Sequence, residues 1–184
     1  MSPMHIVVWL MGVAFNIING LVIGGWLAGY GPTSQVYWND RLGYVYFGML
    51  LWAYGLLGNM FHDDDLREIR RSAKKEEEKQ TEIRDKKERG KDGRSASLKS
   101  DIRVYKVPKN GLFQLVLHAH YLCEWIEWTG FWIFGGWAFV PGRAFLLNEI
   151  STMLPRALQG KRWYIEHFGE EAIQGRKAVI PGLL

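Results

Sequence analysis

A column of polar side chains follows an apolar segment of the chain, and its residue types suit an anionic ligand. The column recurs at intervals of three or four residues and consists of Asn59, Asp63, Arg67 and Arg70. That spacing places its members on one face of a helix. The planar fork of an arginine donates two parallel hydrogen bonds to a phosphate, while Asn and Asp can bind sugar hydroxyls or a carboxamide. The alternative is a solvated helix with an Asp63–Arg67 pair, which adds only about 0.2–0.5 kcal/mol.

A second column lies inside the aromatic segment "HYLCEWIEW", where His120, Glu124 and Glu127 share a helical face. An ionised side chain that faces lipid costs roughly 2.5–3.5 kcal/mol, so we expect all three to point into a helix bundle or a polar cavity. A substrate or cofactor site is favoured, with a polar network between helices as the alternative. No metal site is predicted, because carboxylate-bridged centres need Glu-x-x-His motifs from several helices and the sequence has no such repeat.

A third column lies near the C-terminus, where Arg156, Gly160 and Tyr164 recur every four residues. Basic side chains beside an apolar helix commonly anchor it at a membrane interface or contact lipid headgroups. Taken alone, this column is interpreted as an interfacial anchor.

The segments that carry these columns are long and apolar. About 20 apolar residues are needed to cross the roughly 30 Å hydrocarbon core of a bilayer as a helix. Four segments meet or approach that length: residues 4–30, 42–61, 111–140 and, marginally, 144–158. The third segment contains two glutamates, and the fourth is interrupted by Pro155. The sequence therefore predicts an all-α, polytopic membrane bundle of three to four transmembrane helices.

Charge is concentrated in one central stretch. Residues 63–106 hold 12 of the 19 acidic and 15 of the 23 basic residues. Within it, residues 72–103 nearly lack large apolar side chains and are predicted to be a disordered insertion or a solvated helix. Its acids lie close to its bases, so no nucleic-acid partner is expected. Lys and Arg mark cytoplasmic loops, which places this stretch and the basic C-terminal tail in the cytosol.

Six short motifs occur in an order that is similar to that of a known family. They are "FNIINGL", "GNMFHDDDLREIR", "YKVPKNGLF", "HYLCEWIEWTGF", "RALQGKRWY" and "RKAVIPGLL". Together they resemble the C-terminal region of the steroid 5α-reductase family, the 3-oxo-5α-steroid 4-dehydrogenases, over nearly the whole chain apart from the charged insertion. The expected organisation is two transmembrane helices with a cytosolic extension in residues 1–71, the insertion in 72–103, and C-terminal helices and tail in 104–184.

The resemblance implies an enzyme of the endoplasmic reticulum membrane that uses NADPH to saturate a carbon–carbon double bond conjugated to a ketone. The implied partners are the lipid bilayer and a small, hydrophobic, steroid-like enone. The chain departs from the family's pattern at His120, where Asn is usual, and at Gly160, where His is usual. The positions assigned to the cofactor are Asn59, Asp63, Arg67, Arg70, Tyr105, Lys106, His120, Glu124, Arg156 and Tyr164.

No catalytic residue is predicted. The resemblance begins near the middle of the family's pattern, so the family's Gln-Glu pair and the tyrosine that polarise the 3-oxo group have no matching positions in this chain. Two alternatives to an active steroid reductase stay open. One is a truncated, non-catalytic membrane relative that at most binds NADPH or lipid, and the other is a trans-2-enoyl-CoA reductase, whose family shares the architecture.

Overall fold

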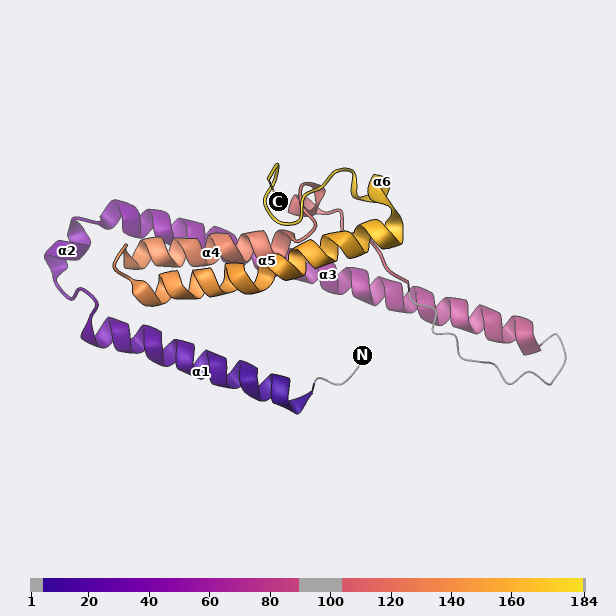
Figure 1. Ribbon diagram of the computed structural model, residues 1–184, viewed down its shortest axis with the longest axis horizontal. Helices are drawn as coiled ribbons and strands as arrows, with labels where there is room; N and C mark the ends of the chain where they lie inside the picture. The colour runs from indigo at the N-terminus through magenta and orange to yellow at the C-terminus, as the bar shows by residue number, and fades with distance from the viewer. Residues whose placement is uncertain (1–4, 90–103, 184) are drawn as a thin grey trace. The chain divides into compact units, whose positions relative to one another are not determined.

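The computed structural model describes residues 5–89 and 104–183, which form helices joined by loops (Figure 1). The helices are α1 (Ile6–Gly29), α2 (Gln35–Asn39), α3 (Leu42–Arg89), the 3-10 helix η1 (Gly111–Gln114), α4 (Ala119–Gly135), α5 (Val140–Phe168) and α6 (Glu170–Ile173). Within the described residues there is no β-strand, and one isolated bridge pairs Val116 with Lys177. The predicted all-α fold is confirmed.

The described chain divides into two compact units. Unit 1 consists of the described residues up to Asn59 together with Tyr121–Arg156. Unit 2 consists of Met60–His120 and of the described residues from Ala157 onward. Because the boundaries fall inside helices, α3, α4 and α5 each contribute residues to both units. Most charged side chains of the described residues belong to unit 2.

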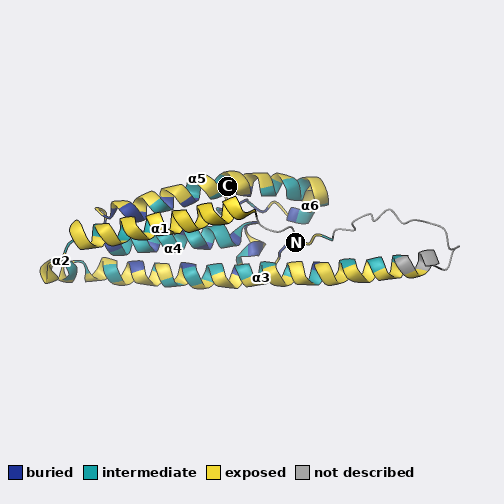
Figure 2. Cartoon of the chain, turned by 90° about the horizontal axis from the view of Figure 1, so that it is seen from below, coloured by how far each residue is buried: buried dark blue, intermediate teal, exposed yellow. Residues whose placement is uncertain are grey.

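In unit 1, α1 has no charged residue and is mostly apolar, and none of its residues is buried (Figure 2). Two aromatic contacts connect α1 with the rest of the unit. The ring centroids are 5.9 Å apart for Phe15 and Phe145, and 4.7 Å apart for Trp26 and Phe139. Of the described helices, α1 is the one that is long and apolar enough to cross a membrane, judged by length and composition. The number of further spans stays a prediction.

Glycines bring α3 and α4 into close contact in unit 1. At Gly48, Gly55 and Gly130, an added Cβ atom would collide with backbone atoms of the facing helix. α4 also packs on α5 through aromatic rings, with the centroids of Trp128 and Phe145 3.9 Å apart. In Figure 1, α4 runs alongside the first part of α5. Backbone contact through small residues on one side and ring packing on the other hold α4 in place.

Two predicted helix boundaries are wrong. The segment at residues 111–140 does not form one helix, because Gly111 turns the chain with φ of 55° into η1 and α4 begins only at Ala119. The short segment at residues 144–158 is part of α5, which continues through Pro155 to Phe168. Proline removes one backbone donor and can bend a helix, but here it does not end the helix.

α3 extends well into the charged stretch. Of the two predictions for residues 72–103, the helix is the one that the structure has at residues 72–89, while residues 90–103 lie outside the described residues. Glu, Lys and Arg are good helix formers. Ion pairs one turn apart, such as Lys74 with Glu78 at 3.7 Å, add a small stabilisation.

Candidate ligand-binding site

A cavity of about 420 Å³ in unit 2 brings together five of the predicted site residues. Its walls come from α3, from the segment that precedes η1, from the start of α4 and from the last part of α5. The predicted residues in the lining are Arg70, Tyr105, Lys106, His120 and Tyr164, and the others are Leu66, Ile69, Ala73, Val104, Leu117, His118 and Trp163. Among the described residues, no acidic side chain lines the cavity.

Contacts with α3 hold the extended segment at residues 104–106. The backbone N–H of Val104 donates to a carboxylate oxygen of Glu77 at 2.7 Å. The ammonium group of Lys106 pairs with the carboxylate of Glu76 at 2.9 Å. Lys106 is therefore partly neutralised, although it still presents a cation to the cavity.

Aromatic rings form one wall of the cavity. The ring centroids of Tyr105 and Trp163 are 4.9 Å apart, in an edge-to-face arrangement. Those of Trp163 and Tyr164 are 5.3 Å apart, and those of Tyr164 and His118 are 6.5 Å apart. The wall thus combines the segment before η1, the end of α5 and the residue before α4.

The C-terminal tail positions the residues that lead into α4. The backbone N–H groups of Leu117 and His118 donate to the carbonyl oxygens of Lys177 and Ala178, both at 2.9 Å. Nδ1 of His118 also lies 3.2 Å from the Ala178 carbonyl oxygen. The imidazole covers Gly160, where an added Cβ atom would come within 2.5 Å of Nε2. Gly160 thereby makes room for His118.

Arg176 fixes the loops around this segment. Its guanidinium is buried and donates to four backbone carbonyl groups. The oxygens of Pro108 and Phe113 are each 2.7 Å away, that of Ile173 is 2.9 Å away, and that of Ala172 is 3.2 Å away. Arg176 is thus a structural cation that joins the loop around η1 to α6.

α3 holds the same loop through two side chains. Buried His62 accepts a hydrogen bond from the backbone N–H of Leu112 at 3.0 Å. Gly111 allows this approach, since an added Cβ atom would lie 2.9 Å from Nε2 of His62. The amide of Asn110 donates to the carboxylate of Asp65. The walls of the cavity are therefore connected by hydrogen bonds as well as by apolar packing.

Burial keeps the two histidines of the cavity neutral. The pKa of His120 is lowered to about 4, mainly by burial and in addition by the neighbouring groups His118, His62 and Arg70. Burial also lowers the pKa of His118, against the effect of its bond to the Ala178 carbonyl. At neutral pH each imidazole can therefore donate one hydrogen bond and accept another.

Arg70 supplies the uncompensated charge of the cavity. Its side chain is exposed and makes no ion pair with any carboxylate in the described part of the chain. Burial raises the pKa of Tyr164, although the charges of Arg176 and Arg70 act in the opposite direction. The phenol therefore remains a hydrogen-bond donor at neutral pH, in a cavity whose charge is positive.

Five predicted site residues do not line this cavity. They are Asn59, Asp63, Arg67, Glu124 and Arg156. Asn59, Glu124 and Arg156 belong to unit 1. Arg67 pairs with Asp64 at 2.9 Å on the exposed surface of α3, not with Asp63 as the solvated-helix alternative predicted. The proposed roles of all five stay predictions.

Sequence reasoning did not select His118 or Trp163 for the site. His118 is two residues from His120, a spacing that separates side chains on a helix. His118 and His120 both line the cavity because α4 begins only at Ala119, which leaves His118 outside the helix. The position of Trp163 directly before the predicted site residue Tyr164 could have indicated it.

The comparisons with known proteins agree on one family. The chain matches a family model described as 3-oxo-5-alpha-steroid 4-dehydrogenase over residues 2–84 and 95–184. An uncharacterized protein of Schizosaccharomyces pombe is 37% identical over 183 residues, which cover 100% of this chain and 59% of that protein. The 3-oxo-5-alpha-steroid 4-dehydrogenase 1 of Rattus norvegicus is 30% identical over 185 residues, or 100% of this chain and 58% of the relative. Steroid 5-alpha-reductase DET2 of Solanum lycopersicum is 29% identical over 170 residues, which cover 92% of this chain and 53% of that protein.

The chain spans between 53% and 59% of the length of these three relatives. The family match includes both units and the segments that build the cavity. It confirms the resemblance inferred from the six sequence motifs. The chain belongs to the 3-oxo-5-alpha-steroid 4-dehydrogenase family.

Proposed function

We propose that the cavity of unit 2 binds NADPH, and that the chain serves the reduction of a carbon–carbon double bond conjugated to a ketone in a steroid or a related lipid. The observation that carries this proposal is Arg70, a cation on the cavity's lining that, among the described residues, has no carboxylate partner and no acidic neighbour in that lining. A guanidinium in that setting favours a phosphate-bearing ligand. The names of the rat and tomato relatives support a steroid as the substrate class.

The residues around the cavity fit part of a dinucleotide. The volume of the cavity, about 420 Å³, lies within the roughly 300–1,000 Å³ that is usual for pockets of drug-sized ligands, so the cavity would enclose one part of NADPH and not the whole molecule. Arg70 and Lys106 would hold phosphate oxygens, and the rings of Tyr105 and Trp163 offer flat surfaces for a base. The neutral imidazole of His120 and the phenol of Tyr164 would bind hydroxyl or carboxamide groups without adding charge.

When bound, NADPH supplies a hydride, which goes to the β-carbon of the enone. The part played by this chain's own residues is to bind and to orient. Arg70 would neutralise phosphate charge, and the Tyr164 hydroxyl, whose pKa is raised by burial, would stay protonated and donate a hydrogen bond. Groups fixed in advance lose little entropy when the ligand binds, and the tail and Arg176 fix this cavity. No side chain is assigned to the proton that the α-carbon receives.

We further propose that unit 1 lies in the membrane of the endoplasmic reticulum and unit 2 in the cytosol. The exposed apolar surface of α1 would be covered by lipid there. Close glycine contacts such as those between α3 and α4 are typical of helices packed in a bilayer. The Lys and Arg residues of unit 2 favour the cytosolic side.

An assay in microsomes that contain the expressed chain tests the proposed reaction. The microsomes receive a Δ4-3-oxosteroid and NADPH that carries deuterium at its transferable position. We expect a 5α-reduced product that contains deuterium, detected by mass spectrometry. A parallel incubation with a long-chain trans-2-enoyl-CoA distinguishes the enoyl-thioester reductase alternative.

The same microsomes separate binding from catalysis. NADPH binding without either product would favour a non-catalytic relative and contradict the proposed reaction. If neither binding nor product were found, the cofactor assignment of the cavity would be wrong as well.

A further inference from the structure

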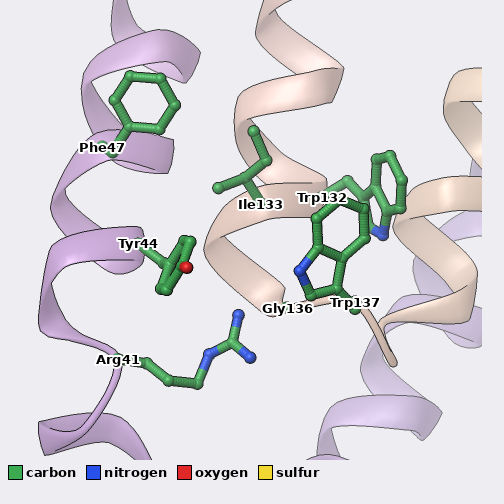
Figure 3. A pocket seen from close by; sticks show the side chains of 7 residues that line it. All are labelled: Arg41, Tyr44, Phe47, Trp132, Ile133, Gly136 and Trp137. Atoms are coloured by element: carbon green, nitrogen blue, oxygen red, sulfur yellow. The ribbon is translucent and has the colours of Figure 1, made fainter.

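Two cavities of the described chain hold a cation in different ways. The smaller one, of about 120 Å³ in unit 1, places Arg41 among aromatic rings such as those of Tyr44 and Trp137 (Figure 3). The guanidinium carbon lies 5.4 Å from the ring centroid of Tyr44. At the larger cavity, in unit 2, Lys106 is instead paired with a carboxylate. This ion pair bears on ligand binding, because Lys106 is one of the proposed phosphate contacts.

The ammonium group of Lys106 lies against one face of α3. Its Nζ is 2.9 Å from a carboxylate oxygen of Glu76 and 3.5 Å from the hydroxyl oxygen of Ser72. Ser72 and Glu76 are four residues apart and therefore share a helical face. Lys106 lines the cavity, whereas neither of these two partners does. The charged end of Lys106 is thus held by residues outside the lining.

The ion pair is open to water and can exchange partners. The side chains of Lys106 and Glu76 are 40% and 47% exposed. An exposed ion pair contributes little stability, because water and salt weaken the attraction. NADPH carries several phosphate groups, so its negative charge exceeds that of one carboxylate. A phosphate in the cavity can therefore replace Glu76 as the partner of Lys106.

The segment that carries Lys106 has other contacts that fix its backbone. The backbone N–H of Val104 donates to a carboxylate oxygen of Glu77 at 2.7 Å. The ring of Tyr105 packs edge-to-face against Trp163, with the centroids 4.9 Å apart. Both contacts lie within unit 2. They would keep the backbone in place while the lysine side chain turns away from α3.

We propose that Glu76 competes with a phosphate of NADPH for the ammonium group of Lys106, and that this competition sets the affinity of the cavity. In the free protein Glu76 holds Lys106, and in the complex the phosphate takes the place of the carboxylate. Glu76 is thus a positioning residue, which acts on the ligand through Lys106. This inference rests on the proposed binding of NADPH in unit 2. Its consequence is that removing an acidic group outside the cavity strengthens binding.

Titration of the purified full chain with NADPH in detergent micelles tests the competition. We expect Glu76→Gln to bind NADPH roughly two- to fivefold more tightly than wild type, the factor that corresponds to the loss of an exposed ion pair. Glu76→Asp keeps the charge and should stay closer to wild type. The gain in Glu76→Gln should be largest at an ionic strength of about 0.01 M and shrink near 1 M, where salt screens charges beyond about 3 Å.

Glu78→Gln is the matched control. Glu78 is an exposed residue of the same helix and pairs with Lys74 at 3.7 Å, so its substitution removes the same charge without releasing Lys106. Glu78→Gln should bind NADPH like wild type. An equal gain in both variants would reduce the effect to net charge and overturn the competition. Unchanged or weaker binding by Glu76→Gln would overturn it as well.

A double-mutant cycle shows whether Glu76 acts through Lys106. In a Lys106→Gln background, Glu76→Gln should bring no gain, because no ammonium group is left to release. A full gain that persists there would mean that Glu76 repels the ligand directly, which would contradict its role as a positioning residue. If wild type bound no NADPH at all, the cofactor assignment of the cavity would be wrong together with this inference. NADPH binding that Glu76→Gln leaves unchanged would overturn this inference alone.

Discussion

At the scale of single residues, Arg70 is the side chain on which the NADPH proposal depends most. A charge-assisted hydrogen bond contributes about 1.5–3 kcal/mol, so we expect Arg70→Ala to weaken NADPH binding roughly 10- to 100-fold. If Arg70 binds the 2′-phosphate, NADH should lose much less affinity than NADPH. Titration of purified protein with both nucleotides measures the two dissociation constants.

Arg71 provides the control for this prediction. It is the next residue of α3, is exposed, and does not line the cavity. Arg71→Ala should bind NADPH like wild type. Equal weakening of NADPH and NADH in Arg70→Ala would rule out a 2′-phosphate contact, and unchanged binding of both would remove Arg70 from the site.

His120 should make stability depend on pH. Its pKa is about 4 in the folded protein, below the ordinary value of 6.5, so between these values the unfolded chain binds a proton that the folded chain does not. Stability is therefore highest above pH 6.5 and falls as the pH decreases toward 4, by at most about 1.4 kcal/mol per pH unit for one group. The lowered pKa of His118 acts in the same direction.

Denaturant unfolding between pH 4 and pH 7 measures this dependence. We expect His120→Gln to reduce the slope of stability against pH, while the same substitution at exposed His167 keeps it. An unchanged slope in His120→Gln would show that the imidazole is not held neutral by burial.

Local spacing was informative where a helix continues without interruption. Arg70 and Tyr164 were selected from helical columns, and both line the cavity. His118 and Arg176 were not selected, because their positions depend on contacts 60 or more residues away along the chain. A bond such as that from Arg176 to the Phe113 carbonyl cannot be read from sequence periodicity.

At the scale of helices, the contact between α3 and α4 in unit 1 depends on glycine. A Cβ atom on Gly55 would collide with the backbone of α4, and such overpacking typically costs about 1–3 kcal/mol. We therefore expect Gly55→Ala to lower the melting temperature of the protein in detergent micelles, followed by circular dichroism.

Gly43 lies in the same helix, and an added Cβ atom there meets nothing within 4 Å. Gly43→Ala should leave stability unchanged or raise it by up to about 1 kcal/mol, since alanine is the better helix former. If both substitutions had the same effect, the close approach of α3 and α4 would not be a source of stability.

The helix boundaries divide into those that the sequence determines locally and those that it does not. Hydrophobicity located α1 and the first part of α3 within a few residues. The start of α4 was predicted too early, because the apolar residues around Phe113 are buried by a loop and not by a helix. Pro155 was predicted to interrupt the helix, but α5 continues through it.

At the scale of the whole molecule, the division of charge in the sequence corresponds to the division into units. Uncharged apolar segments form most of unit 1, and the charged segments belong to unit 2. The family could be inferred from the order of six motifs along the chain, although each motif alone is short. The cavity itself could not be outlined from sequence, because its walls come from four separate segments.

The most direct test of the account is hydrogen exchange of the full chain in detergent micelles, measured by mass spectrometry with and without NADPH. The account predicts slower exchange on NADPH binding in the peptides that contain the cavity's walls, around Arg70, Tyr105, His120 and Tyr164, and unchanged exchange in α1. Exchange that NADPH leaves unchanged in these peptides, or slows only in unit 1, would contradict the assignment of the cofactor to this cavity.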